Sequence, residues 1–335
     1  MVKTRNIKER YLIAPQMQFY DQITCDYKPF VMFFNRANFS SKFVNTDDLG
    51  FRLNSLDDKI KKITNFFNCK EVSIVIGGSC VFGFGATSDE KTISSQLSKK
   101  TNHIFLNFGA TAFNSKQEIL LFLNFFKKYK KIKNVIIISG ANDIFLNLLN
   151  NQDEWGDFFF KNKYSKIYDS YKKRNRISHN LINYFESIFN KKTKKLSENN
   201  KNSINYKNVE TNYDEIFSLW KTLSDAYKFN LKFFLQPIPS WLNKPLSIEE
   251  KKLFNILDNS NDTAHINLKQ LSSIDNYNNF LSILEKVSKK NNVDFIDLNK
   301  ELLDIKNINK WLFVDRVHMT NQGYEELAEI VLKNV

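Results

Sequence analysis

Short apolar runs alternate with longer amphipathic segments along most of this chain, and this alternation limits the possible folds more than any other feature. The apolar runs are rich in Ile, Val and Phe, and most end at Gly or Pro, as buried strands do. They cover residues 72–76, 103–108, 134–139, 231–236 and 293–298. Helical patterns cover residues 90–100, 115–130, 212–228, 277–290 and 320–334. Strands that alternate with helices predict an α/β fold whose parallel sheet, of about five strands, is covered on both faces.

Two parts of the chain lie outside this alternation. Residues 1–65 carry aromatic patches and a turn signal at 45–50, and we interpret them as an N-terminal extension packed on a main domain of residues 66–335. Residues 145–210 are too long for a structureless connection in a compact domain, so they predict a helical insertion that ends in a flexible loop. Because the insertion begins just after the apolar run 134–139, at the end of a predicted strand, we expect it to form a cap over a functional site at that edge of the sheet. A surface insertion without that role is the alternative.

The composition argues against several classes of protein. With 42% hydrophobic residues among 335, the chain can bury a substantial core. The net charge of +13 raises the possibility of a nucleic-acid or anionic membrane partner. The lysines are scattered among asparagines, however, and no nucleic-acid-binding module is recognisable. We therefore expect a solvated basic surface and no nucleic-acid partner, with attraction of an anionic substrate as the alternative.

The cysteines and the N-terminus bear on localisation and cofactors. Cys25, Cys69 and Cys80 are odd in number and have neither metal-ligand nor redox spacing. This suits free thiols in a reducing compartment. Residues 1–10 are polar and lack the apolar core of a signal peptide, and no apolar run approaches the length of a membrane span. The expectation is a cytoplasmic protein without cofactor, metal or stable membrane insertion.

A serine directly after the first predicted strand is the strongest candidate for chemistry. Gly77 and Gly78 end the apolar run, so the hydroxyl of Ser79 should stand at the carboxyl end of the sheet. A serine hydroxyl is a weak nucleophile unless a base takes its proton. Asp315 and His318 lie three residues apart, just before the last helix and at the same sheet edge. We predict that His318 is the base and that Asp315 orients its imidazole.

Two competing assignments are less favourable. Asp262 and His265 have the same spacing, but they lie in a polar stretch well before the last strand and are interpreted as a surface turn. Cys80 adjoins Ser79, but its side chain should point elsewhere because the chain is turning into a helix there. Ser79 is therefore the expected nucleophile.

Acyl transfer also requires donors for the oxyanion, and two further strand ends offer them. Gly109 follows the second strand, where its backbone N–H can approach a substrate closely. Asn142 follows the third strand and carries a side-chain amide. With the N–H of Ser79, these groups predict an oxyanion hole. Asp143 is expected to be a structural acceptor instead of a second catalytic acid.

Taken in order, four segments of the chain resemble the conserved blocks of the SGNH/GDSL hydrolase superfamily. They are Gly77-Gly78-Ser79, Asn107-Phe108-Gly109, Gly140-Ala141-Asn142-Asp143 and Asp315-Arg316-Val317-His318. The first has Gly where the commoner form has Asp. The resemblance covers about residues 70–150 and 215–335. It implies a flavodoxin-like three-layer sandwich, the site roles given above, and hydrolysis or transfer of an acyl ester without metal.

The function expected from these residues is that of a serine esterase acting on a small acyl group, foremost an O-acetyl group on a carbohydrate. The Gly-Gly-Ser form of the first block resembles sugar O-acetyl esterases more than long-chain lipases. A thioesterase or lysophospholipase, and a catalytically silent carbohydrate-binding protein, are the alternatives. The substrate is expected to be a small-molecule or glycan ester. The segment Asp48-Leu49-Gly50-Phe51-Arg52 resembles an element that precedes the first block in some of these hydrolases. We interpret Arg52 as part of a structural ion pair, and contact with an anionic substrate is the alternative.

Overall fold

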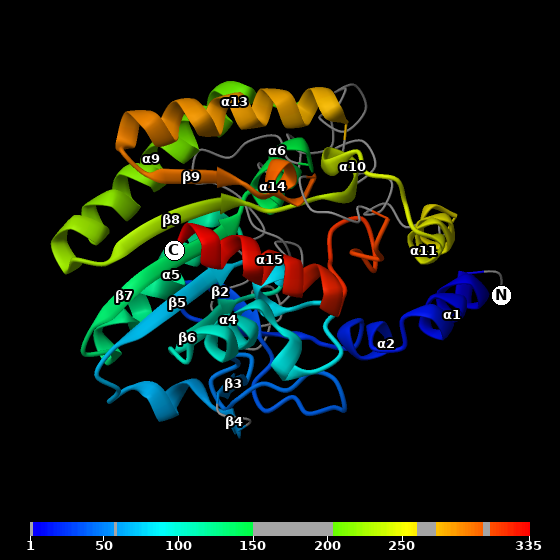
Figure 1. Cartoon of the computed structure of the whole chain (residues 1–335), viewed down its shortest axis with the longest axis horizontal. Helices are drawn as coiled ribbons and strands as arrows, with labels where there is room; N and C mark the ends of the chain where they lie inside the picture. The colour runs from blue at the N-terminus through cyan, green and yellow to red at the C-terminus, as the bar shows by residue number, and fades with distance from the viewer. Residues whose placement is uncertain (1–2, 57–58, 150–203, 260–272, 304–308) are drawn as a thin grey trace, which may run out of the picture. The chain divides into compact units, whose positions relative to one another are not determined.

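The computed structural model describes residues 3–56, 59–149, 204–259, 273–303 and 309–335 (Figure 1). The chain divides into two compact units, one made of Met1–Phe145 with Tyr206–Val335 and the other of Leu146–Asn205. The first unit contains Ser79, Asp315 and His318, and the end of α6 (Ala141–Leu149), from Leu146, belongs to the second. Most of the expected cap, together with Asp262 and His265, lies outside the described residues.

A five-stranded parallel sheet forms the centre of the first unit, as the alternation predicts. Its strands are β5 (Val72–Gly77), β6 (Phe105–Gly109), β7 (Ile132–Ser139), β8 (Asn230–Leu235) and β9 (Asp294–Asp297). Their order is β6-β5-β7-β8-β9, and every neighbouring pair is parallel. The chain moves outward from β5 to β6, then crosses to the other side of β5. The order therefore reverses between β5 and β7, which is where doubly wound sheets bind ligands.

Helices cover both faces of this sheet and complete a three-layer α/β/α sandwich (Figure 1). One face carries α3 (Ser79–Phe82), α4 (Ile93–Thr101), α14 (Leu298–Leu303) and α15 (Asn321–Asn334); the other carries α5 (Ser115–Phe125), α9 (Tyr206–Tyr227) and α13 (Ile274–Asn291). Adjacent side chains of β8 point to opposite faces of the sheet. Phe234 joins the core cluster beneath α15, whereas the Phe233 ring packs 4.9 Å from that of Phe217 on α9.

Side-chain caps explain where several helices begin. Thr320 accepts a hydrogen bond from Gly323 N at the start of α15, as a threonine N-cap does. Asn114 and Gln117 form a reciprocal capping box at the start of α5. The expected helix boundaries differ most from the structure at α9 and α5. Helix α9 begins at Tyr206 and not at residue 212, because its first turns are polar, and α5 ends at Phe125 before a 3₁₀ turn, η3 (Phe126–Lys128).

The N-terminal residues form small elements that contact the main sheet and its helices. They are α1 (Lys3–Ile13), α2 (Met17–Tyr20), β1 (Cys25–Lys28), β2 (Met32–Asn35), β3 (Asn54–Leu56), β4 (Lys59–Lys61) and η1 (Ile63–Phe66). Helix α1 lies beside α11 (Ile248–Asp258) (Figure 1). The remaining elements are η2 (Asp89–Lys91), α6 (Ala141–Leu149) and α10 (Pro239–Leu242). Among the described residues, none of the helices is long and apolar enough to cross a membrane.

Arg52 is a structural residue, as expected. Its side chain is fully buried, pairs with Asp89 at 2.5 Å and donates to Tyr20 Oη at 2.9 Å and Phe43 O at 2.8 Å. Tyr20 in turn donates to the carbonyls of Gly83 and Ala86 in the loop after α3. The guanidinium therefore joins the N-terminal segment to the segment after α3, and its donors are directed at protein groups.

Candidate active site

Ser79 lies on a sharp turn from strand to helix at the carboxyl end of the sheet. Strand β5 ends at Gly77, Gly78 is the N-cap, and Ser79 is the first residue of α3. Side chains on either glycine would clash. A Cβ on Gly77 would lie 2.2 Å from Ile138 O, and one on Gly78 would lie 2.8 Å from Asn142 Nδ2. The two glycines thus allow β7 and the start of α6 to approach Ser79 closely.

His318 and Asp315 meet Ser79 in one continuous chain of hydrogen bonds. Ser79 Oγ lies 2.8 Å from His318 Nε2, and His318 Nδ1 lies 2.8 Å from Asp315 Oδ2. The serine and the acid are buried, whereas the imidazole retains 19% of its side-chain exposure. The structure therefore brings together the three residues that the sequence placed 239 positions apart at the widest.

The segment between β9 and α15 holds the acid and the imidazole in a tight loop. Backbone bonds from Val314 N to His318 O, at 2.9 Å, and from Thr320 N to Leu312 O, at 2.8 Å, close this loop. Within it, Asp315 Oδ1 accepts from Val317 N at 2.9 Å and from His318 N at 2.7 Å. These bonds fix the carboxylate, so Oδ2 is directed at the imidazole.

Asp315 is held ionised by its partners. Burial on its own would raise the pKa of this carboxyl, but the interaction with His318, the hydrogen bonds and the charge of Arg10 together lower it well below its usual range. A carboxyl group whose pKa is lowered by folding stabilises the folded state at every pH above its pKa in the unfolded chain, which is about 3.9 for aspartate. That contribution is lost as the pH falls through the lower, folded-state pKa.

A buried ion pair that the sequence did not reveal anchors the start of this loop. Glu250 Oε1 accepts from Leu312 N at 3.0 Å and Phe313 N at 3.1 Å, while its Oε2 lies 2.5 Å from Lys244 Nζ. Both charged side chains are completely buried. Since a charge buried without a partner is costly, each residue needs the other, and together they hold the backbone that leads to Asp315.

Phe84 fixes the plane of the imidazole. The Phe84 and His318 rings are stacked, with centroids 4.2 Å apart and planes inclined by 30°. Gly83 and Gly85 flank Phe84 at φ of +86° and +99°, a region that side chains disfavour. These two glycines let the chain carry Phe84 across the imidazole.

Cys80 is unsuited to be the nucleophile, as expected. Its side chain is buried, and burial raises the pKa of the thiol to about 12, against a smaller opposite effect of a hydrogen bond with Tyr324. A thiol with that pKa contains almost no thiolate at neutral pH. Of the two adjacent side chains, Ser79 is therefore the one that remains a candidate nucleophile.

Gly109 differs from the expectation that its N–H faces the site. That N–H donates to Asn107 Oδ1 at 2.9 Å, and Asn107 Nδ2 donates to Val81 O at 2.8 Å. A Cβ on Gly109 would lie only 2.0 Å from Phe82 N. The physical reason for the glycine is thus the close contact between β6 and α3, because no side chain fits between their backbones.

Ala112, three residues further on, has the features expected of an oxyanion donor. Its φ is +61°, a left-handed conformation that alanine rarely adopts. Among the described residues, its N–H has no hydrogen-bond partner. The neighbouring Phe113 O accepts from Asn142 Nδ2 at 2.7 Å and would lie 3.4 Å from a Cβ on Gly78. The Ala112 loop therefore lies beside the Gly78-Ser79 turn. The sequence analysis did not identify Ala112 as a candidate donor. The only feature of the sequence that could have indicated it is its position shortly after the Asn107-Phe108-Gly109 segment.

Asn142 and Asp143 begin α6 with different roles. Asn142 Nδ2 lies close to Gly78, as described above, and among the described residues its hydrogen-bond partner is Phe113 O, so one of its two amide hydrogens has no partner there. Asp143 points into the protein, where its Oδ1 accepts from Ser115 Oγ at 2.6 Å, and burial raises the pKa of its carboxyl. Asp143 is thus the structural acceptor that was expected.

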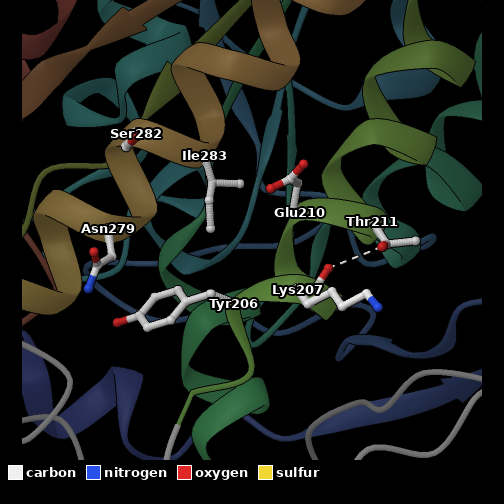
Figure 2. Close-up of a pocket in the computed structure, with 7 residues that line it drawn as sticks. All are labelled: Tyr206, Lys207, Glu210, Thr211, Asn279, Ser282 and Ile283. Carbon is white, nitrogen blue, oxygen red and sulfur yellow. Dashed lines mark hydrogen bonds between the residues drawn. The ribbon is translucent and has the colours of Figure 1, made fainter.

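A separate groove lies between α9 and α13 and has a volume of about 570 Å³ (Figure 2). It is lined by Tyr206, Lys207, Glu210, Thr211, Asn279, Ser282 and Ile283. None of the residues around Ser79 contributes to it. Among the described residues, no cluster of three or more His, Cys, Asp or Glu side chains is suited to hold a metal ion.

Several solved structures are similar to this chain. A lipase/acylhydrolase from Enterococcus faecalis is 12% identical over 79% of this chain and 94% of its own, with a TM-score of 0.42. The acetyl xylan esterase AlAXEase is 12% identical over 79% of this chain and 99% of its own, with a TM-score of 0.40. A G-D-S-L family lipolytic protein from Veillonella parvula is 12% identical over 78% of this chain and 96% of its own, with a TM-score of 0.39.

No protein-family model matches the chain, and no curated protein matches it either. The identity and superposition of the structural neighbours are too low to assign an activity or a substrate to this chain. Its chemistry has to be inferred from its own residues.

Proposed function

We propose that this protein is an SGNH-type serine esterase that cleaves or transfers a small acyl group. The observation that carries the proposal is the unbroken chain of hydrogen bonds from Ser79 Oγ through His318 to Asp315, with 2.8 Å at both steps. A hydroxyl within this distance of an oriented imidazole is arranged for proton removal. This geometry supports nucleophilic catalysis by Ser79 better than a purely binding role.

The reaction then follows two acyl-transfer steps. Ser79 Oγ attacks the ester carbonyl while His318 Nε2 takes its proton, and the same imidazole returns that proton to the departing alcohol. Water or a second alcohol next attacks the acyl-enzyme with His318 again as base. Asp315 stays ionised throughout and stabilises the imidazolium, consistent with the lowered pKa of its carboxyl.

The oxyanion is assigned three donors, one of which differs from the sequence-based expectation. The N–H of Ser79 lacks an intrahelical partner because Ser79 is the first residue of α3. The Asn142 amide and the N–H of Ala112 complete the set, with Ala112 in place of Gly109, whose N–H is already bonded.

Asn142→Ala is expected to lower kcat by about 10²–10³-fold and to leave KM nearly unchanged, because a donor of this kind acts on the charge that develops in the transition state. Steady-state kinetics with p-nitrophenyl acetate measure this. The matched control is Asn147→Ala on the same helix. A large rise in KM with unchanged kcat would show that Asn142 binds the ground state and is not an oxyanion donor.

The acyl group is proposed to be small, foremost an O-acetyl group on a carbohydrate. Ser79 is only 8% exposed, and its Oγ lies at the edge of a His318 ring whose face is covered by Phe84, which suits a short acyl chain better than a long one. A thioesterase or lysophospholipase would share the same Ser79 chemistry but would need room for a longer chain. Carbohydrate binding without catalysis is the alternative from a different class.

A fluorophosphonate probe tests the nucleophile independently of the natural substrate. Intact-mass spectrometry is expected to show one adduct per chain, and peptide mapping should locate it on Ser79, because only an activated serine reacts rapidly with such probes. Ser79→Ala, checked for native folding by circular dichroism, should remain unlabelled. Folded wild-type protein without an adduct would contradict catalysis and favour the silent binding protein.

A further inference from the structure

The acid of the proposed triad has a second side-chain partner besides His318, and this partner, a cation, comes from the N-terminal helix. Arg10 on α1 donates through Nη2 to Asp315 Oδ2 at 3.1 Å, across 305 positions of sequence. Its Nη1 donates to Asp21 Oδ2 at 3.0 Å. The residue is 6% exposed, and among the described residues its buried Nε has no hydrogen-bond partner. Arg10 is therefore a buried cation in direct contact with the acid.

We propose that Arg10 is a positioning residue for the Ser79 site, so that α1 is part of the active site. It holds the Asp315 carboxylate in place and offsets part of its charge, which sets how strongly His318 retains a proton. This inference rests on the proposed esterase function. It assigns a catalytic purpose to an N-terminal segment that the sequence alone placed outside the chemistry.

The atoms involved favour this role over simple attachment of α1. Asp315 Oδ2 accepts from both His318 Nδ1, at 2.8 Å, and Arg10 Nη2, at 3.1 Å. Oδ1 is occupied by the backbone of its own loop. Arg10 and the imidazole therefore compete for the charge of a single oxygen. A permanent cation at that oxygen disfavours a second cation beside it, so Arg10 opposes the gain of a proton by the imidazole.

Other charged or titratable groups among the described residues adjoin Arg10, Asp315 or their loop. Asp21 reaches Asp315 only through Arg10 and also accepts from Tyr11 Oη at 3.0 Å. Tyr324, on α15, is buried and interacts electrostatically with Asp315, and burial raises the pKa of its phenol well above the usual value. Arg316, on the same loop, pairs with Asp258 through both Nε and Nη2. Arg10 is thus the cation that bonds the carboxylate from outside its own loop.

Arg10→Gln tests the proposal, and Arg316→Gln is its matched control. Both variants remove one arginine charge near the loop, but only Arg10 contacts Asp315. Two readouts are taken: the pH profile of kcat/KM for p-nitrophenyl acetate, and the titration of His318 followed by ¹H–¹⁵N NMR. The NMR titration needs no substrate, and the chain has only four histidines.

In Arg10→Gln, the acid limb of the profile and the midpoint of the His318 NMR titration are both expected to move to higher pH, because the cation that competes for Asp315 Oδ2 is lost. At a pH below the limb, kcat/KM should then fall below that of the wild type. Arg10→Lys keeps the charge, so its titration should stay near the wild-type midpoint. It also supplies a variant with less disturbed packing in case Arg10→Gln does not fold.

The outcomes separate the two proposals. Wild-type midpoints in folded Arg10→Gln, an equal shift in Arg316→Gln, or a shift in Arg10→Lys as large as in Arg10→Gln would overturn the role of Arg10. If wild-type protein neither hydrolyses esters nor reacts with fluorophosphonate, the proposed function fails. The NMR titration would still report whether Arg10 sets the protonation of His318.

Discussion

Replacing Ser79 with alanine is expected to lower kcat/KM for p-nitrophenyl acetate about a thousandfold or more. The reason is that the only oxygen within reach of His318 Nε2 in this turn, Ser79 Oγ at 2.8 Å, is lost while the imidazole and the carboxylate stay in place. What remains is the rate supplied by binding and by the oxyanion donors. Initial rates of both proteins, at matched folding, measure the effect.

Cys80→Ala is the matched control for this experiment. It alters the adjacent buried side chain of α3 but leaves Ser79 Oγ and its partner untouched, so most of the activity should remain. Activity that persists in Ser79→Ala would exclude Ser79 as nucleophile. A series of p-nitrophenyl esters separates the alternatives, since a small-acyl esterase prefers acetate and a thioesterase or lysophospholipase gains with chain length.

Gly109→Ala is expected to destabilise the protein by about 3 kcal/mol or more. The added Cβ would lie 2.0 Å from Phe82 N and 2.4 Å from Val81 C. Both are backbone atoms of α3, so no side-chain rearrangement can relieve the clash. Strand β6 and α3 must separate, and the hydrogen bond from Asn107 Nδ2 to Val81 O stretches or breaks. The midpoint of urea unfolding measures the loss.

Ala112→Gly is the opposite substitution in the same loop region and is the control. Glycine adopts a φ of +61° without the strain that alanine carries there, although it also gains freedom in the unfolded chain. The free energy of unfolding should stay unchanged or rise by up to about 1 kcal/mol. A stable Gly109→Ala protein would mean that β6 and α3 are not in the close contact described, and a strongly destabilised Ala112→Gly protein would mean that Ala112 is not strained.

Local patterns in the sequence were sufficient for the sheet and for much of the site. Most strands are short apolar runs that end near Gly or Pro, because a buried parallel strand needs apolar side chains on both faces and a turn at its end. The meeting of Ser79, Asp315 and His318 was also predictable. Residues that follow the carboxyl ends of parallel strands gather at one edge of the sheet. The position of a residue relative to the predicted strands therefore already indicates which other residues lie near it.

Other parts of the site depend on contacts between residues far apart in the chain. Gly109 follows a strand, and its sequence context is the same whether its N–H faces a substrate or, as observed, the side chain of Asn107. The strained φ of Ala112 is likewise set by how its loop packs on the neighbouring turn. Nothing in the composition of α1 singles out Arg10 from the other basic residues there.

The sequence by itself thus determined the layers of the fold and which segments meet at the carboxyl edge of the sheet, because strand and helix patterns act within a few residues. Only the tertiary structure decided which groups point at Ser79 and which cation faces Asp315. Those choices depend on burial and hydrogen bonding between segments as distant as Arg10 and Asp315, where one carboxylate oxygen serves two partners. A local pattern carries no information about such contacts, since their energy arises only once the folded chain has excluded water from between them.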